Sequence, residues 1–544
     1  MIKNIIKKKI LSSYNSLSKN IELKIEDIDI SQPKQILHGD YATNLCMKFS
    51  SSIQLNPMTF AEELSKKIIN DHGEFFNNVD FVKPGFINFK VKESVLNDCL
   101  LKIYKNKNIY GSGDKKKKKI LVEFVSANPT GLLHLGHLRN AAVGDSLSRI
   151  LRFYGYDVQS EYYINDFGNQ IKNLGESLKI RIKNINGESL KISEDGYHGE
   201  YLIDVANQFI NNKKNYKLDD EDVLQDFAKD YLLAEIKKDL NQININFDNW
   251  FSEKDCIHSN GNLDKALELL RKLDLLYEKD GALWIKTSQH GDVDDWVLVK
   301  SDKNPTYFLS DIAYHLDKIS RGFDRIINIW GADHHSHVTR LTSSIKGIND
   351  EDSLKLEFVM IQFVRLLKNG LDISMSKRSG QYTTIRDLLS LVDKDVIRFM
   401  MVSRSSDTHF DFDLDNCLKD SDENPVFYIQ YANARINSIL KKGSSIDLND
   451  IETVFLEDIK ELSLIKKIID FEYVIEDSAK NLSPHKLAFY LQDLAKDFHS
   501  YYKTTKILNN EINETKIKLI LISTIKSVLS TGLGLLGVSS PEEM

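Results

Sequence analysis

Two histidines, His134 and His137, are the residues whose type and spacing most directly indicate chemistry. They belong to the stretch Val122–Asn140, which reads VEFVSANPTGLLHLGHLRN. Two imidazoles three residues apart lie on the same side of a helical turn, where both can donate hydrogen bonds to phosphate oxygens. Gly136 between them has no side chain, so a flat base or ribose can approach the backbone. For a pair with this spacing alone, a helix cap and a metal site are the alternatives.

The residues around the histidine pair predict a strand, a turn and a helix. Leu121–Val125 is apolar and β-prone, Asn128–Gly131 consists of turn residues, and helix-forming residues begin at Ala141. Such a unit directs backbone N–H groups and a helix N-terminus at whatever lies above the end of the strand. It therefore predicts a phosphate-binding site on an α/β sheet.

The same stretch resembles the HIGH motif of class I aminoacyl-tRNA synthetases, in the form typical of arginyl-tRNA synthetases. Further strings resemble that family in the same order along nearly all of the 544 residues. They are HGDYATNLCMKFS (38–50), PGFINFKV (84–91), YHGEY (197–201), WGADHH (330–335), DISMSKRSG (372–380) and GLLGVSSPEEM (534–544). The resemblance implies an α/β Rossmann-like catalytic domain of the HIGH-type nucleotidyl transferases. It also implies an α+β N-terminal domain and an all-α C-terminal anticodon-binding bundle.

Length and composition agree with a multidomain enzyme. A chain of 544 residues is too long for one core, so two to four domains are expected. The formal net charge of −7 argues against a generally basic nucleic-acid binder, so any RNA contact must come from local patches. The four cysteines are far apart and form no CxxC pair, which favours a reducing cytosol and no structural zinc. No apolar run approaches the roughly 20 residues that a membrane helix needs.

The resemblance divides the chain into three domains. Residues 1–113 correspond to an N-terminal domain that contacts the tRNA elbow in the family, 114–420 to the catalytic domain, and 421–544 to a DALR-type anticodon-binding domain. The charged stretch at about 175–295 is expected to be an insertion between the two halves of the nucleotide-binding sheet. Lys115–Lys119, which follow glycine and serine, predict a solvated linker, and contact with RNA phosphate is the alternative.

The N-terminus is basic and contains regularly spaced isoleucines. Ile2, Ile5, Ile6 and Ile10 have helical spacing and predict an amphipathic first helix with these side chains inward. An organelle transit peptide is the alternative, but the segment lacks arginine and turns acidic by Glu22.

Two carboxylates are candidates for binding the substrate side chain. A guanidinium is planar and always charged, so its recognition calls for carboxylates with bidentate geometry. Glu123 in the first strand and Asp311 at the end of an apolar run fit this role. The resemblance implies that Tyr307 and Asp311 hold the guanidinium, and that Asn128 with Ser126 holds the α-ammonium group. A helix N-cap is the alternative for Asp311.

A second predicted strand end carries polar residues. Ile326–Trp330 is a buried-strand run, followed directly by Gly331, Asp333 and His334. The resemblance implies that Gly331 and Asp333 contact ATP and that His334 contacts arginine. The alternative is a metal site formed by Asp333 and the histidines of HHSH (334–337). We expect no resident metal here, because no distant fourth ligand stands out.

The string at 372–380 resembles the KMSKS loop, with departures. Lys377 matches the second lysine of that motif, which stabilises the triphosphate as charge develops on pyrophosphate. Ser374 stands where the first lysine would be, and Arg378 replaces the final serine. The resemblance implies that Met375 and Lys377 contact ATP.

The C-terminal region predicts a helical bundle. Tyr428 and Tyr431 are three residues apart on one helix and therefore share a face. The resemblance implies that they line the anticodon-loop surface, where aromatic rings stack on unpaired bases; core packing is the alternative. Leu487, Leu491 and Leu494 repeat at helical spacing and indicate core.

The resemblance as a whole implies ATP-dependent arginylation of tRNA(Arg), with Mg²⁺ shielding the triphosphate. Arginyl-adenylate would form first, and the arginyl group would then pass to the 3′-terminal ribose, releasing AMP. His134, His137 and Lys377 would carry catalysis by stabilising charge, so no covalent nucleophile is needed. We expect a cytoplasmic monomer without membrane contact. Three alternatives remain: a class I synthetase for another amino acid, a catalytically silent paralogue that only binds tRNA, and a zinc hydrolase.

Overall fold

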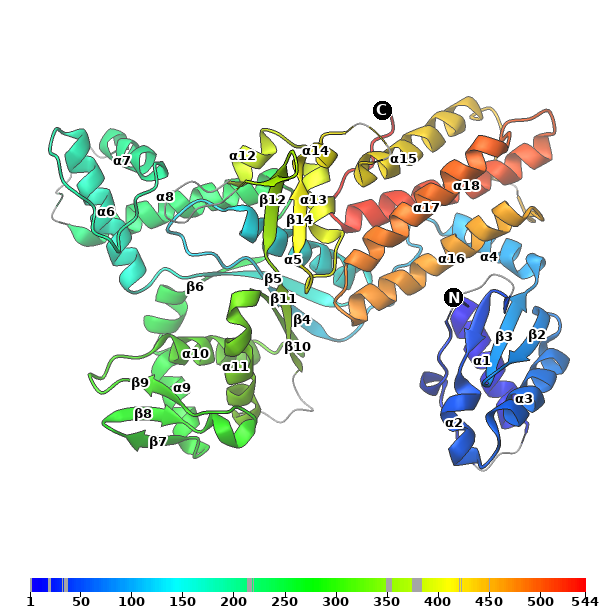
Figure 1. The fold of residues 1–544 in the computed structure, drawn as a ribbon, viewed down its shortest axis with the longest axis horizontal. Coiled ribbons are helices and arrows are strands. Elements are labelled where there is room, and N and C mark those ends of the chain that lie inside the picture. The colour runs from blue at the N-terminus through cyan, green and yellow to red at the C-terminus, as the bar shows by residue number, and fades with distance from the viewer. Residues whose placement is uncertain are drawn as a thin grey trace.

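The chain folds into an elongated molecule with its parallel sheet near the centre (Figure 1). The structure is a computed structural model. It describes residues 2–17, 21–31, 33, 38–212, 218, 220–348, 355–373, 384–419, 421, 423–449 and 451–544.

The N-terminal domain is a three-stranded antiparallel sheet, in the order β1-β3-β2, covered by helices. Its first helix has the predicted inward face, because Ile2, Ile6 and Ile10 are at most 1% exposed and Ile5 is half-buried. Pro57 follows the side-chain cap of Asn56, which fixes the start of the third helix. The elements are α1 (Ile2–Asn15), η1 (Ile25–Asp27), β1 (Tyr41–Thr43), α2 (Leu45–Ile53), α3 (Pro57–His72), β2 (Phe76–Val82) and β3 (Phe86–Val91).

Helix α4 (Glu93–Lys105) leaves this domain and packs against the C-terminal helices. The Asn97 side chain forms hydrogen bonds of 3.0 and 3.1 Å with the Leu456 backbone, donating to its carbonyl and accepting from its N–H. The prediction of a wholly solvated linker after α4 was wrong for Gly111, which is buried beside Phe471. It was also wrong for Lys116, whose ammonium lies 3.7 Å from the centroid of the Tyr154 ring. The other lysines of that run are exposed, as predicted.

The catalytic region is built on a five-stranded sheet in which all neighbours pair in parallel, in the order β11-β10-β4-β5-β6. All five strands therefore end at the same edge of the sheet. The strands are β4 (Lys119–Glu123), β5 (Asp157–Ile164), β6 (Asn249–Ser252), β10 (Arg325–Gly331) and β11 (Lys355–Ile361).

Helix α5 (Leu135–Phe153) follows β4 and packs closely on the sheet. A Cβ atom at Gly144 would lie only 2.2 Å from the Phe124 ring, so glycine is required where the helix crosses the end of the strand. The predicted strand, turn and helix around the histidine pair are therefore confirmed, although α5 begins earlier than Ala141.

The prediction of one insertion at about 175–295 was wrong in one respect, because β6 lies inside that range and belongs to the central sheet. The segments before and after β6 in the sequence form two separate units, which Figure 1 shows on opposite sides of β6. The first is a helical unit with its own apolar core, made of α6 (Asn169–Ile185), α7 (Tyr201–Asn212) and α8 (Glu221–Gln242). The second contains η3 (Lys254–His258), α9 (Asn262–Lys272), β7 (Leu276–Lys279), β8 (Ala282–Ile285), η4 (Thr287–His290) and β9 (Trp296–Val299).

The remaining elements of the catalytic region surround the second half of the sheet. Ile326–Trp330 lies within β10, as the buried run predicted. The elements are α10 (Tyr307–Ser320), η5 (Ala332–His334), α11 (His335–Ile348), β12 (Val364–Lys368), β13 (Leu371–Asp372), α12 (Ile385–Leu389), α13 (Lys394–Val402), β14 (Phe410–Asp413) and α14 (Leu414–Cys417).

The C-terminal region is an all-α bundle, as predicted. The leucines predicted as core, at 487, 491 and 494, are fully buried. Its helices are α15 (Pro425–Lys442), α16 (Ile459–Lys480), α17 (His485–Thr504) and α18 (Ile512–Leu535). Among the described residues, α18 is long and apolar enough to cross a membrane by length and composition, contrary to our expectation. However, 61% of its 18-residue apolar stretch is buried, and α18 packs against α15, α16 and α17.

Candidate active site

A cavity of about 890 Å³ lies at the edge of the central sheet where the strands end. Residues that follow β4, β5, β10 and β11 line it, together with residues of α10 and α11. The predicted residues that line this active-site cavity are Glu123, Ser126, Asn128, His134, Gly136, His137, Asp311, Gly331, Asp333 and His334. The fold thus brings together residues that are more than 200 positions apart in the sequence.

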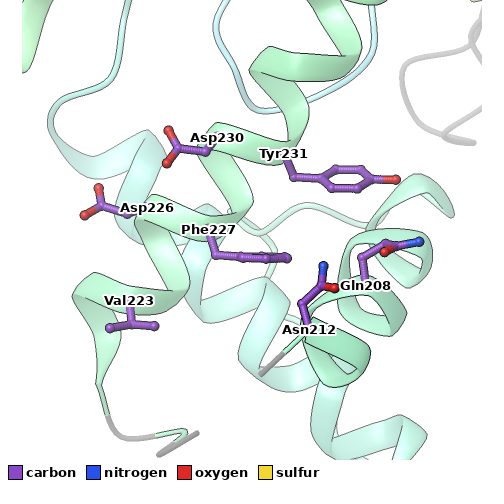
Figure 2. Close-up of a pocket in the computed structure, with 7 residues that line it drawn as sticks. All are labelled: Gln208, Asn212, Val223, Asp226, Phe227, Asp230 and Tyr231. Carbon is purple, nitrogen blue, oxygen red and sulfur yellow. The ribbon is translucent and has the colours of Figure 1, made fainter. Parts of the chain in front are cut away.

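A second hollow, of about 410 Å³, lies between α7 and α8. Figure 2 shows Phe227 and Tyr231 side by side, facing Gln208 and Asn212, while Asp226 and Asp230 project to the other side. None of the predicted site residues lines this hollow. The chemistry indicated by the sequence therefore belongs to the larger cavity.

The two motif histidines form one stacked unit at the start of α5. Their rings are 3.8 Å apart between centroids and inclined by 27°. His134 is the N-cap of the helix, and its Nδ1 accepts a hydrogen bond from the Gly136 N–H at 3.2 Å. The predicted alternative of a helix cap is thus true of His134, and both histidines also line the cavity. This arrangement suits an anion, because the helix N-terminus adds partial positive charge.

The environment keeps His137 neutral in the ligand-free site. Burial of the ring, followed by the effect of the neighbouring His134, lowers the pKa of His137 from 6.5 to about 3. A neutral imidazole still has one N–H to donate to a phosphate oxygen.

We expect the His137 ring not to titrate between pH 5 and pH 8 in the ligand-free protein. The reason is that burial disfavours the charged form, so protonation occurs only near pH 3. NMR of ¹³C-labelled imidazoles, with His137→Gln to assign the signal, measures this directly. The unfolded chain in denaturant is the control and should titrate near 6.5. A folded-state midpoint near 6.5 would contradict the assignment.

The backbone between β4 and the turn is strained. Val125 and Ser126 both have positive φ, of +66° and +42°, which is unusual for residues with a side chain and most of all for a β-branched one. The Val125 N–H donates to Asn140 Oδ1 at 2.7 Å, and the Asn140 amide donates to the Ile329 carbonyl at 2.8 Å. Hydrogen bonds from α5 and β10 therefore hold this conformation, which turns the chain over the cavity.

Glu123 lines the cavity, but both of its carboxylate oxygens already have partners. Lys318, which is fully buried on α10, donates to Oε2 at 2.6 Å, and the Ser126 hydroxyl donates to Oε1 at 2.9 Å. Lys318 also donates to Asn328 at 2.8 Å. The charge of Glu123 is thus balanced inside the protein, and direct binding of a substrate guanidinium by Glu123 stays a prediction.

We expect Lys318→Met to lower the free energy of unfolding by about 3–5 kcal/mol, because it leaves Glu123 charged and buried without its partner. Urea unfolding followed by tryptophan fluorescence measures the loss. The matched control is the double variant E123Q/K318M, which removes both charges and should recover most of the stability. Equal losses in the single and double variants would show that the ion pair is not the cause.

Asp311 lies in the second turn of α10, so the alternative of an N-cap was wrong: the cap position is Thr306. Its carboxylate is one-third exposed and faces the cavity. His337 Nε2 donates to Asp311 Oδ2 at 2.8 Å. The sequence grouped His337 with possible metal ligands, whereas the fold makes it a partner that orients the carboxylate. Among the described residues, no group of three or more His, Cys, Asp or Glu side chains could hold a metal ion.

The turn before the histidine pair is supported by the helical unit of α6–α8. The Asn128 amide donates to Gln170 Oε1 at 2.7 Å. The Tyr201 hydroxyl donates to the Thr130 carbonyl at 2.6 Å, and Gly131 lies beside the same ring. The string at 197–201 therefore acts by holding the active-site turn rather than by touching the cavity.

Three predicted site residues are not found among the residues that line the cavity, one of them described by the structure and two not. Tyr307 is the first residue of α10, is 65% exposed and is not among the residues lining the cavity. Met375 and Lys377, with the departures Ser374 and Arg378, lie outside the described residues.

The chain re-enters the described part of the structure directly beside the histidine pair. Thr384 pairs with His134 as an antiparallel bridge, and the Ile385 N–H donates to the Leu133 carbonyl at 3.0 Å. The first described residues after Lys377 are thus held next to His134.

Two further residues, which are not among the predicted site residues, line the cavity. Asn165, after β5, has a buried side-chain oxygen without a hydrogen-bond partner among the described residues. Arg340 on α11 also lines the cavity. The sequence does indicate Asn165, because this polar residue ends an apolar strand, where α/β sheets place ligands. Arg340 has no local signal, because it is one helical residue among many.

The predicted aromatic face of the C-terminal bundle is present. Tyr428 and Tyr431 are half-buried and both lie against His499, with ring centroids 4.4 and 5.8 Å away. Arg435 donates to the Tyr431 hydroxyl at 2.6 Å, and its guanidinium lies 4.3 Å from the centroid of that ring. Aromatic rings beside a cation suit unpaired bases of RNA.

Comparisons with known proteins agree with this arrangement. Residues 99–421 match the family described as "tRNA synthetases class I (R), catalytic domain". Residues 1–91 match the "Arginyl tRNA synthetase N terminal domain", and 429–544 match the "DALR anticodon binding domain".

Named relatives are similar over almost their entire length. The arginine–tRNA ligase of Desulforamulus reducens is 40% identical over 537 residues, which cover 96% of this chain and 95% of that protein. The arginine–tRNA ligase of Staphylococcus aureus RF122 is 40% identical over 532 residues, with the same coverage. A solved arginyl-tRNA synthetase from Thermus thermophilus has a TM-score of 0.79 and covers 100% of both chains. At 22% identity, the latter likeness concerns the fold alone.

Proposed function

The chain belongs to the class I arginyl-tRNA synthetases, and from this premise we propose how its residues carry out the reaction. It is an enzyme that activates arginine with ATP and joins the arginyl group to the 3′-terminal ribose of tRNA. The observation that carries the assignment of the site is the cavity in which the stacked His134–His137 pair and Asp311 converge. One cavity thus contains hydrogen-bond donors for phosphate and a carboxylate for a cationic substrate.

The histidine pair and Lys377 act on the triphosphate in this proposal. The carboxylate of arginine attacks the α-phosphorus in line, and pyrophosphate leaves. His134, His137 and Gly136 lie where backbone N–H groups and imidazole N–H groups can meet the phosphate oxygens. Lys377 supplies the positive charge as negative charge builds on pyrophosphate. The bridge between Thr384, seven residues after Lys377, and His134 supports this role for Lys377.

Arginine lies between the strand ends in this proposal. Asp311 binds the guanidinium, with its carboxylate oriented by His337. Asn128 and Ser126 hold the α-ammonium group, while Glu123, fixed by Lys318, sets the position of Ser126. Gly331, Asp333 and His334 complete the wall of the cavity next to nucleotide and amino acid. Tyr307 takes part in this proposal only after a movement, because it does not line the cavity here.

Mg²⁺ enters this proposal as a companion of ATP. The described residues offer no cage of three or more ligating side chains, and Mg²⁺ is usually held by substrate phosphates and water with one or two carboxylates. Asp333, an exposed carboxylate at the cavity wall, is the residue that would hold it. When bound, the ion shields the charge of the triphosphate.

The division into residues 1–113, 114–420 and 421–544 assigns tRNA contacts to the flanking domains. Tyr428 and Tyr431 are proposed to face the anticodon loop of tRNA(Arg), which the aromatic and cationic character of that face supports. We propose a cytoplasmic monomer without membrane contact; the burial of α18 in the bundle supports the last point.

Arginine-dependent ATP–pyrophosphate exchange, with and without tRNA and across all twenty amino acids, tests the proposal. Exchange with arginine alone among them is the expected result. Exchange with a different amino acid would overturn the role of Asp311 while keeping the class I fold. Binding of tRNA without any exchange would favour a catalytically silent protein.

A further inference from the structure

Arg340 is a cavity residue to which the proposed reaction gives no task. It lies on α11, three residues after His337, and its side chain lines the active-site cavity. The guanidinium carbon is 3.3 Å from the centroid of the Trp296 ring and 5.5 Å from that of Phe308. This is a close cation–π contact, so the guanidinium is held flat against the indole.

The hydrogen-bond donors of Arg340 are not used inside the protein. Its Nε is buried without a partner, and among the described residues no acceptor bonds to its terminal nitrogens. The terminal nitrogens of two fully buried arginines do have partners: Arg139, whose Nε is likewise unpartnered, donates to three backbone carbonyls, and Arg398 donates to Asp145 and to backbone carbonyls. A guanidinium carries five N–H donors in a fixed fork, so Arg340 presents an unfilled anion site.

Neighbouring groups hold Arg340 in place and keep it beside the cavity. The Trp296 indole N–H donates to Asp292 Oδ2 at 2.8 Å, which fixes the platform. Burial lowers the pKa of Arg340, while the charges of Asp292 and Asp311 raise it. The platform residue belongs to β9 of the small antiparallel sheet β7-β8-β9, which lies at the outer side of the catalytic region in Figure 1.

The small substrates do not account for this site. Arg340 lies on α11 one helical turn after His337, whose ring bonds to Asp311. In the proposed function Asp311 takes the guanidinium end of arginine, so the α-carboxylate lies at the far end of the substrate. In the proposed function the triphosphate lies at the histidine pair at the start of α5, whereas Arg340 lies on α11. Arg340 therefore calls for an anion other than the arginine carboxylate and the triphosphate. The remaining substrate of this family is RNA, whose backbone phosphates are anions.

We propose that Arg340, held flat on Trp296, binds a backbone phosphate of the single-stranded 3′ end of tRNA as that strand enters the cavity. The inference rests on the proposed function. A planar guanidinium fits the two free oxygens of a phosphodiester in a bidentate manner, and an aromatic ring beside it can meet a base. Arg340 is thus a substrate-binding residue for RNA and not for ATP or arginine.

Binding of two RNAs separates this role from a general structural one. Arg340→Gln should weaken binding of intact tRNA(Arg) about 10-fold and leave binding of tRNA lacking its 3′-terminal CCA unchanged. Arg340→Lys should give an intermediate loss, because charge remains but the planar fork does not. The slope of log K against log salt should become shallower by about 0.7 for intact tRNA, as expected for one lost single-strand phosphate contact.

Arg365→Gln is the matched control, because Arg365 is an exposed arginine bonded to Asp411 and should change neither affinity. Trp296→Phe should keep the platform and Trp296→Ala should behave like R340Q. The inference is overturned if R340Q binds both RNAs like the wild type, or weakens both equally. It is also overturned if R340Q raises KM for arginine or ATP while kcat/KM for tRNA and its salt slope stay unchanged. Failure of the wild type to arginylate tRNA would instead count against the proposed function, because the binding comparison needs no activity.

Discussion

His137→Ala should lower kcat for arginylation by a factor on the order of 10² to 10³, with little change in KM for arginine. The ring is stacked 3.8 Å from His134 at the start of α5 and lines the cavity. Removing one preorganised donor from a site where charge develops typically costs about 2.7–4 kcal/mol in the transition state. Steady-state aminoacylation at saturating tRNA and ATP measures the effect.

The double variant H134A/H137A tests whether the two rings act as a unit. We expect its loss to be smaller than the product of the single losses, because the rings contact each other. His485→Ala on α17 is the control and should leave kcat unchanged, because His485 belongs to the C-terminal bundle and does not line the cavity. A kcat for H137A within threefold of the wild type would remove the histidine pair from the mechanism.

Asp311→Asn should lower kcat/KM for arginine by about 2–3 kcal/mol, which is roughly 30- to 150-fold, mainly through KM. The amide has no charge to pair with a guanidinium and can offer only one acceptor oxygen. The expected loss of kcat/KM is moderate because the carboxylate is one-third exposed and therefore partly screened by water. Initial rates at varied arginine measure it, and the variant should discriminate less between arginine and its uncharged analogue citrulline.

Asp317→Asn on the same helix is the matched control for Asp311→Asn. Asp317 bonds to Arg321 and does not line the cavity, so its replacement should affect stability more than KM for arginine. Equal losses of kcat/KM in the two variants would mean that the effect on arginine comes from disturbing α10 as a whole.

The sequence alone predicted features that depend on short-range physics. The position of His134 and His137 on one face at the start of a helix follows from the turn residues before them and the helical spacing. The inward isoleucines of α1 and the buried strand β10 follow from apolar periodicity. The resemblance to arginyl-tRNA synthetases, carried by several strings in order, gave the family and the reaction, and the comparisons confirm both.

Tertiary structure alone decided how the polar residues are paired. Glu123 was a candidate ligand in the sequence, yet its charge is balanced by Lys318, 195 residues away. Asp311 was a candidate ligand with a helix cap as the alternative; it lies inside α10 and is oriented by His337 from α11. β6 looked like part of an insertion and joins the central sheet, and α4 leaves its own domain for the C-terminal bundle.

The physical reason is the range of the interactions. Capping, turns and periodic burial act within a few residues and leave a local pattern. A buried ion pair, an oriented carboxylate or an arginine stacked on a distant tryptophan depends on which elements the completed fold brings together. The sequence does not distinguish a charged side chain that is paired inside the protein from one that remains to bind a substrate. The fold decides which of these two roles the side chain has.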